Sequence, residues 1–150
     1  MSLLDWIRKW GRNQPTEAPE LEAAEQQFMG LDVQAAINAQ LAWRKRLEDL
    51  ILKNSSEELD IDVIMQDDQC QLGLWLYEQA AKSTLALHPE FAALREAHRA
   101  FHLHAARVVQ ALRMGGVEAA RGMLEANFDR LFRDIVFYLA TLMHKERTLH

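Results

Sequence analysis

Two long segments with apolar residues at helical spacing, joined by Gly115-Gly116, set the strongest limit on how this chain can fold. Residues 89–114 and 117–145 each place an apolar side chain at every third or fourth position, which is typical of one face of an amphipathic helix. Pro89 suits the first turn of the earlier helix, and the glycine pair ends it. We therefore expect two long helices separated by a short connection.

Two further segments complete the expected fold. Residues 21–53 read as helical with an interruption at Gly30 and with Asp32 as a new N-cap. Arg44 and its charged neighbours on this helix are expected to face water. Residues 69–81 read as a short helix, and the acidic stretch 57–69 before it reads as a loop. The pattern predicts an all-α fold, an antiparallel four-helix bundle with an additional short N-terminal amphipathic helix.

Composition limits the class of protein. The chain has 150 residues, of which 49% are apolar and 26% charged, with six glycines and three prolines, as expected for one helix-rich domain. A net charge of −5 argues against nucleic-acid binding. A single cysteine cannot form an internal disulfide, which favours a reducing cytoplasm. We see neither a signal peptide nor a segment long enough to span a membrane.

Residues 1–12 form a predicted amphipathic helix, and residues 13–29 form a proline-containing linker and the start of the next helix. The apolar face of the first helix comprises Leu3, Leu4, Trp6, Ile7 and Trp10. So short a helix is marginal alone, so this face must dock on something. One interpretation is docking on the bundle or on a second copy, and the other is contact with a membrane surface or a receptor. We expect the linker to separate this helix from the core.

Three side chains form a candidate metal site. Cys70 stands at the start of a predicted helix, where the helix dipole favours a thiolate. His98 and His102 are four residues apart and therefore neighbours on one helix face. One thiolate and two imidazoles supply three of the four ligands of a tetrahedral zinc ion. The alternative is that Cys70 is a small buried apolar residue and that the histidines are ordinary, partly exposed helix residues.

The same residues resemble a known family. Cys70, Gly73 and Trp75 in the string Cys-Gln-Leu-Gly-Leu-Trp, followed by His98 and His102, resemble the bacterial chemoreceptor zinc-binding (CZB) domain. The resemblance covers residues 30–147, which we take as one CZB-like helical bundle. It implies that the cysteine and both histidines bind Zn²⁺. Gly73 is then expected to permit close helix approach beside the site, and Trp75 to anchor the core.

The resemblance also identifies a fourth position. In the family a further histidine lies three residues before a tryptophan on an earlier helix. Here Trp43 holds the tryptophan position, as a second core anchor, and Gln40 holds the ligand position. Gln40 admits three interpretations. Its amide oxygen is a weak ligand, or water completes an open site, or the metal has been lost.

The resemblance implies a function. CZB domains accompany chemoreceptors and diguanylate cyclases, where they report zinc or oxidants such as hypochlorous acid. The implied role is a cytoplasmic sensory module that pairs as a homodimer or signals through such a receptor or cyclase partner. The alternative is a metal-free helical interaction protein. We expect no enzyme, because no general base stands out near the motif and no substrate pocket is implied.

Overall fold

The computed structural model describes residues 2–9, 20–53, 70–82 and 84–148. The elements in chain order are α1 (Leu3–Arg8), the 3₁₀ turn η1 (Ala23–Glu25), β1 (Gln27–Phe28), β2 (Leu31–Asp32), α2 (Val33–Lys53), α4 (Gln71–Lys82), the 3₁₀ turn η3 (Thr84–Leu87), α5 (Pro89–Arg113), α6 (Val117–Met123), the π-helical turn η4 (Leu124–Phe128) and α7 (Asp129–Thr148). The expected all-α class is confirmed. The predicted loop at 57–69 lies outside the described residues, as do Trp10 and residues 13–19 of the predicted linker.

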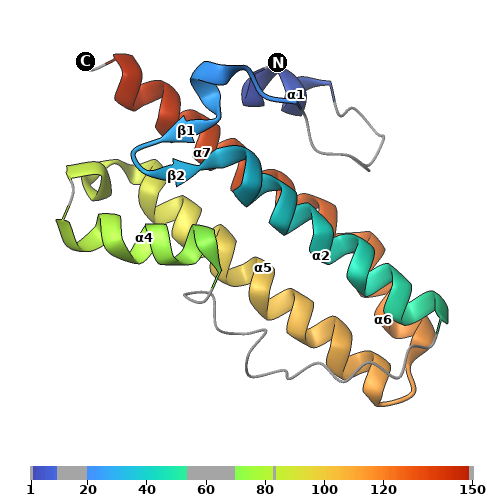
Figure 1. Cartoon of the computed structure of the whole chain (residues 1–150). Helices are drawn as coiled ribbons and strands as arrows, with labels where there is room; N and C mark the ends of the chain where they lie inside the picture. Colours follow the sequence, from blue (N-terminus) through green and yellow to red (C-terminus); the bar gives the residue numbers. More distant parts are fainter. Residues whose placement is uncertain (1, 10–19, 54–69, 83, 149–150) are drawn as a thin grey trace.

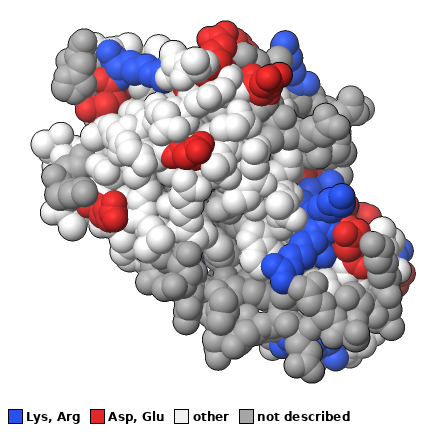
Figure 2. Space-filling view, viewed as in Figure 1, with Lys and Arg blue, Asp and Glu red and all other residues white. Residues whose placement is uncertain are grey.

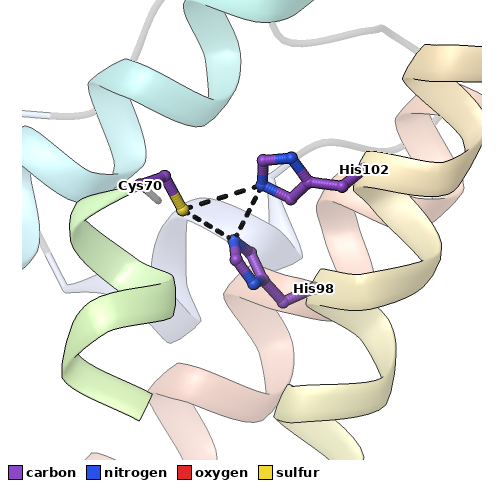
Figure 3. Close-up of side chains that lie close together, drawn as sticks. All are labelled: Cys70, His98 and His102. Carbon is purple, nitrogen blue, oxygen red and sulfur yellow. Dashed lines mark hydrogen bonds between the residues drawn. The ribbon is translucent and has the colours of Figure 1, made fainter. Parts of the chain in front are cut away.

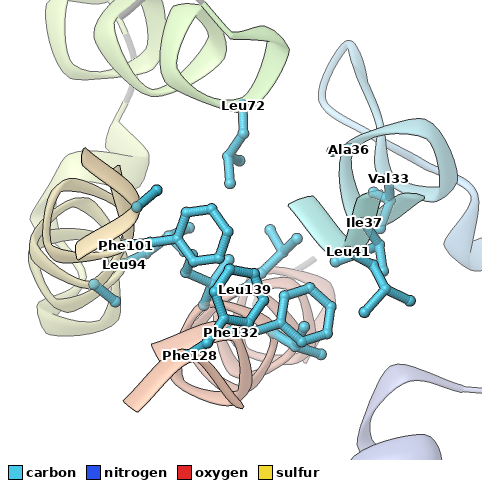
Figure 4. Close-up of a cluster of buried hydrophobic side chains, with 14 of the residues drawn as sticks. Val33, Ala36, Ile37, Leu41, Leu72, Leu94, Phe101, Phe128, Phe132 and Leu139 are labelled. Carbon is cyan, nitrogen blue, oxygen red and sulfur yellow. The ribbon is translucent and has the colours of Figure 1, made fainter. Parts of the chain in front are cut away.

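The long helices pack side by side. α5 packs along α7, and α2 contacts both. Figure 1 shows α2 in front of α7, α5 beside them and the shorter α4 near one end of α5. Their shared core is built from leucine, isoleucine, valine and phenylalanine side chains, among which Phe101, Phe128 and Phe132 are almost fully buried (Figure 4). Among the described helices, none is both long and apolar enough to cross a membrane.

The stretch expected to begin the second helix forms a small hairpin instead. β1 and β2 pair antiparallel, with Phe28 opposite Leu31. Met29 and Gly30, between them, have φ of 48° and 87°, as the two central residues of a tight hairpin turn require. The expected interruption at Gly30 is therefore a reversal of the chain. Asp32 does cap α2 as predicted, because its Oδ1 accepts a hydrogen bond from the Ala35 amide at 3.0 Å.

The N-terminal helix α1 belongs to the core. Leu3, Trp6 and Ile7 are buried, and the Trp6 ring meets Phe132 of α7 edge-on at 6.0 Å. Glu25 fixes the start of the helix by accepting a hydrogen bond from the Leu3 amide at 2.8 Å. The expectation that this helix is separate from the core is wrong. Its apolar face is covered by α7 of the same chain, as the first of the two interpretations had it.

The predicted helix over residues 117–145 is interrupted by the π-helical turn η4. His104 of α5 reaches the residue before this turn, because its Nε2 donates a hydrogen bond to the Met123 carbonyl oxygen at 2.9 Å. Burial lowers the pKa of His104, which keeps the ring neutral. Beyond this turn, Phe132 and Val136 are fully buried, and Leu131 and Tyr138 pack partly buried against the core.

Charged side chains are mixed on the surface. Figure 2 shows acidic side chains spread over one face and basic ones gathered mainly toward its lower right, beside acidic ones. This distribution accords with the net charge of −5.

Candidate metal centre

Cys70 is held at the start of α4 by its own side chain. Its carbonyl oxygen accepts the first helical hydrogen bond, from the Leu74 amide at 2.9 Å. Its Sγ accepts a second one from the Gly73 amide at 3.3 Å. Cys70 therefore occupies the N-cap position, with sulfur in the place that serine or aspartate oxygen usually takes. Both the amide donor and the helix dipole favour the thiolate form.

His98 and His102 meet this sulfur from α5. Their side chains point from successive turns of the helix toward Cys70 (Figure 3). Sγ lies 3.1 Å from His98 Nε2 and 3.6 Å from His102 Nε2, and the two nitrogens lie 3.1 Å apart. His98 is 0% and His102 4% exposed, whereas Cys70 is half-buried. Three ligand atoms thus converge from two helices.

The spacing fits a tetrahedral zinc ion. Zn–S and Zn–N bonds of ordinary length place sulfur and nitrogen about 3.6 Å apart and two nitrogens about 3.3 Å apart. The distances in the structure, 3.1–3.6 Å, are of this size. The donor set of one thiolate and two imidazoles is also one that zinc prefers.

The protonation state of His98 suits a ligand. Desolvation, followed by the neighbouring His102, lowers the pKa of His98 to about 3, so that its imidazole is neutral at physiological pH. Metal binding requires a neutral imidazole. Nδ1 of His98 is buried and has no hydrogen-bond partner within the described part of the chain. Among these residues, the ring therefore lacks the hydrogen bond to a carboxylate or backbone carbonyl that ligand histidines usually make through their second nitrogen.

Gln40 reaches the same place from α2. It is 2% exposed, and its Nε2 lies 3.8 Å from Cys70 Sγ. Its Oε1 is buried without a hydrogen-bond partner among the described residues. An orphaned acceptor beside three ligand atoms is satisfied by a cation or an ordered water. The residues present therefore fit a bound zinc ion, with position 40 at its edge.

The tryptophans differ in their surroundings. Trp75 is 5% exposed, packs on Phe28 and donates a hydrogen bond from Nε1 to the Met29 carbonyl at 3.0 Å. It therefore joins α4 to the hairpin. Trp43 is only partly buried, with the Arg46 guanidinium 5.2 Å from its ring centre.

The other described histidines lie outside the site. His104 is buried but turned toward Met123, and His88 pairs with Glu146 at 3.1 Å. His144 is exposed. Within the described residues, the group with metal-ligand spacing consists of Cys70, His98 and His102.

Sequence reasoning missed a buried arginine one turn from the site. Arg44 was expected to face water, yet it is 7% exposed. Its Nε lies 2.9 Å from Asp129 Oδ1, and its Nη1 lies 2.9 Å from Glu48 Oε1. A cavity of about 420 Å³ opens beside it, lined by side chains of α2, α6 and η4. The available signal was spacing, since Arg44 follows Gln40 by four residues and shares its helix face.

Comparison with known families supports the assignment. Residues 40–109 match the family model described as the chemoreceptor zinc-binding domain. This part of the chain is therefore similar to that family. The CZB match begins at Gln40 and includes Cys70, His98 and His102, so that all four site positions lie inside it. Neither the search of curated proteins nor that of solved structures gave a match.

Proposed function

We propose that the chain is a zinc-binding sensory or regulatory module that signals by associating with another protein. The observation that carries the proposal is the convergence of Cys70 Sγ with Nε2 of His98 and His102 at 3.1–3.6 Å in a buried site. The match of residues 40–109 to the CZB family model supports the same metal. The proposal takes α2, α4, α5 and α7 as the family's antiparallel four-helix bundle. The lone cysteine favours a reducing compartment such as the cytoplasm.

When bound, zinc would be held by Cys70, His98 and His102 and would tie the first turn of α4 to α5. Cys70 would then serve as both ligand and helix cap, since its sulfur already accepts the Gly73 amide. Loss of the sulfur from the site would therefore also weaken the start of α4. Leu72, Trp75 and Leu76 of that helix are buried, so a displacement of α4 would also move side chains of the hydrophobic core.

Oxidation of Cys70 is the proposed second input. Cys70 is the most exposed of the three candidate ligands. A two-electron oxidant such as hypochlorous acid would transfer an oxygen-equivalent to the thiolate, giving a sulfenate and chloride. A sulfenate no longer matches the donor set, and the start of α4 would be released. Candidate recipients of the signal are a second copy of the chain, a chemoreceptor or a diguanylate cyclase.

Metal analysis tests the proposal directly. Protein purified without added metal should contain about one zinc per chain, measured by plasma mass spectrometry. Cys70→Ala and His98→Ala should remove it, while Leu74→Ala, on the exposed side of α4, should retain it. Zinc retained in Cys70→Ala would contradict the ligand assignment.

The second candidate is a metal-free interaction protein of the same fold. Gln40 at the family ligand position and the unsupported Nδ1 of His98 favour it. Well-folded protein that takes up no zinc in an equilibrium titration would support this candidate over the first.

A further inference from the structure

Gln40 presents its nitrogen, not its oxygen, to the candidate ligands. Nε2 lies 3.8 Å from Cys70 Sγ, whereas Oε1 makes no hydrogen bond with the described residues. An amide nitrogen is a hydrogen-bond donor and offers no free lone pair to a metal. In this arrangement Gln40 donates to the sulfur.

The sulfur accordingly receives two N–H groups. The Gly73 amide at 3.3 Å and the Gln40 amide at 3.8 Å both point at Sγ. Two donors stabilise a thiolate and draw electron density from it. This chain thus offers three metal ligands and a hydrogen bond from Gln40 to the sulfur, whereas the family offers four metal ligands. A tetrahedral ion with three protein ligands keeps one open position.

Charge indicates what would fill that position. A zinc ion, one thiolate and two neutral imidazoles carry a net charge of +1. The cluster contains no carboxylate among the described residues, and His98, His102 and Gln40 are all at least 96% buried. A buried uncompensated charge is costly. An anionic fourth ligand removes it, whereas a neutral one does not. Of these four residues, Cys70 is the one that is partly exposed. A ligand from solution would therefore enter past its side chain and must be small.

We propose that Gln40 acts as a hydrogen-bond donor to the Cys70 sulfur and that the fourth metal position is open to a small monoanionic ligand from solution. The exchange is a substitution, in which the anion enters, water leaves, and no electrons are transferred. This inference rests on the proposed function, since it requires metal at Cys70, His98 and His102.

Cobalt substitution tests the inference with an optical readout. Co²⁺ replaces zinc in the full-length protein, and sodium azide serves as the probe. The wild type should show a sulfur-to-cobalt charge-transfer band and a saturable change in its visible spectrum on azide addition. Gln40→His, which places an imidazole at the open position, should bind azide at least about tenfold more weakly.

Gln40→Leu separates a donor from a ligand. Removing the donor should shift the charge-transfer band to lower energy and change azide affinity by less than about threefold. If Gln40 is instead a ligand, Gln40→Leu should raise azide affinity more than about tenfold, which would overturn the inference. Should Gln40→Leu fail to fold by circular dichroism, Gln40→Asn shortens the same side chain by one methylene and removes the same contact.

The failures can be told apart. A wild-type cobalt protein with the charge-transfer band but no response to azide overturns the open position and leaves the proposed function intact. Absence of the band, or its persistence in Cys70→Ala, overturns both the proposed function and this inference.

Discussion

Two buried polar clusters lie one helical turn apart on α2, and they are built on opposite principles. Gln40 faces a group of one cysteine and two histidine side chains, in which Gln40 Oε1 and His98 Nδ1 have no partner among the described residues. Arg44 faces two carboxylates, each 2.9 Å from one of its nitrogens. In the first cluster, these two buried atoms are left for a water molecule or a ligand to satisfy. In the second cluster, the buried Arg44 guanidinium is paired with carboxylates of the same chain.

The difference separates a binding site from a structural connection. Buried polar groups that lack partners cost free energy unless a ligand satisfies them. The Arg44 cluster joins α2 to α7 through Asp129 without any ligand. We therefore expect changes near Gln40 to act on metal affinity, and changes near Arg44 to act on the free energy of unfolding.

The largest effect is expected for Cys70→Ala. It removes one of three protein ligands, so zinc affinity should fall by more than about a hundredfold, beyond what loss of an outer-shell contact causes. A competition titration against a chelator measures this. The free energy of unfolding of the metal-free protein should fall by only about 1 kcal/mol, the usual cost of losing an N-cap, because Sγ also accepts the Gly73 amide. A large destabilisation without metal would show that the first cluster, too, is structural.

Gln40→His should tighten zinc binding by about 10- to 100-fold, because a fourth imidazole closes the coordination sphere. The same chelator competition gives the ratio to wild type, and Gln40→Asn is the matched control. Equal or weaker affinity for the histidine variant would mean that position 40 does not reach the metal.

Arg44→Met should destabilise the metal-free protein by about 2 kcal/mol. Removing one partner of a buried ion pair leaves a carboxylate uncompensated, but the Asp129 and Glu48 side chains are 20% and 38% exposed, which reduces the cost. Urea unfolding measures the change, with Lys45→Met, the exposed neighbour, as control. Loss of zinc affinity with unchanged stability would reverse the roles of the two clusters.

Glu48→Gln should have the smallest effect, at most about 0.5 kcal/mol in the same urea experiment, because Glu48 is the more exposed partner and Arg44 retains Asp129. A loss as large as that of Arg44→Met would mean that Glu48, rather than Asp129, carries the pairing.

The helices were predictable where the apolar spacing is regular and the ends carry turn residues. The ends of α5 at Pro89 and Gly115 followed from local chemistry, as did the Asp32 cap. The hairpin before α2 was not predicted, because two residues per strand are too few to show alternation. Its stability comes from contacts distant in sequence, such as the Trp75 hydrogen bond to Met29.

The site was predictable to the extent that its residues are local or belong to a family motif. His98 and His102 share a helix face by spacing, and their meeting with Cys70 followed from the CZB resemblance. The burial of Arg44 depended on Asp129, 85 residues away. Within α2 the signal was its position four residues after Gln40, and this spacing by itself does not distinguish a buried, paired arginine from an exposed one.

The π-helical turn η4 decides how an insertion or deletion would be tolerated. Ala120, Leu124, Phe128 and Phe132 are buried at intervals of four, a period that drifts by about 40° per step on a regular α-helix. The wide turn absorbs this drift. Deleting one residue between 124 and 128 would restore a regular helix and leave Phe132 close to its present direction, because a π-helical turn holds about one residue more than an α-helical turn. Inserting one residue at the same place would instead rotate the helix beyond it by about 100°. Phe132 would then leave Trp6, and α1 would lose the surface on which it rests.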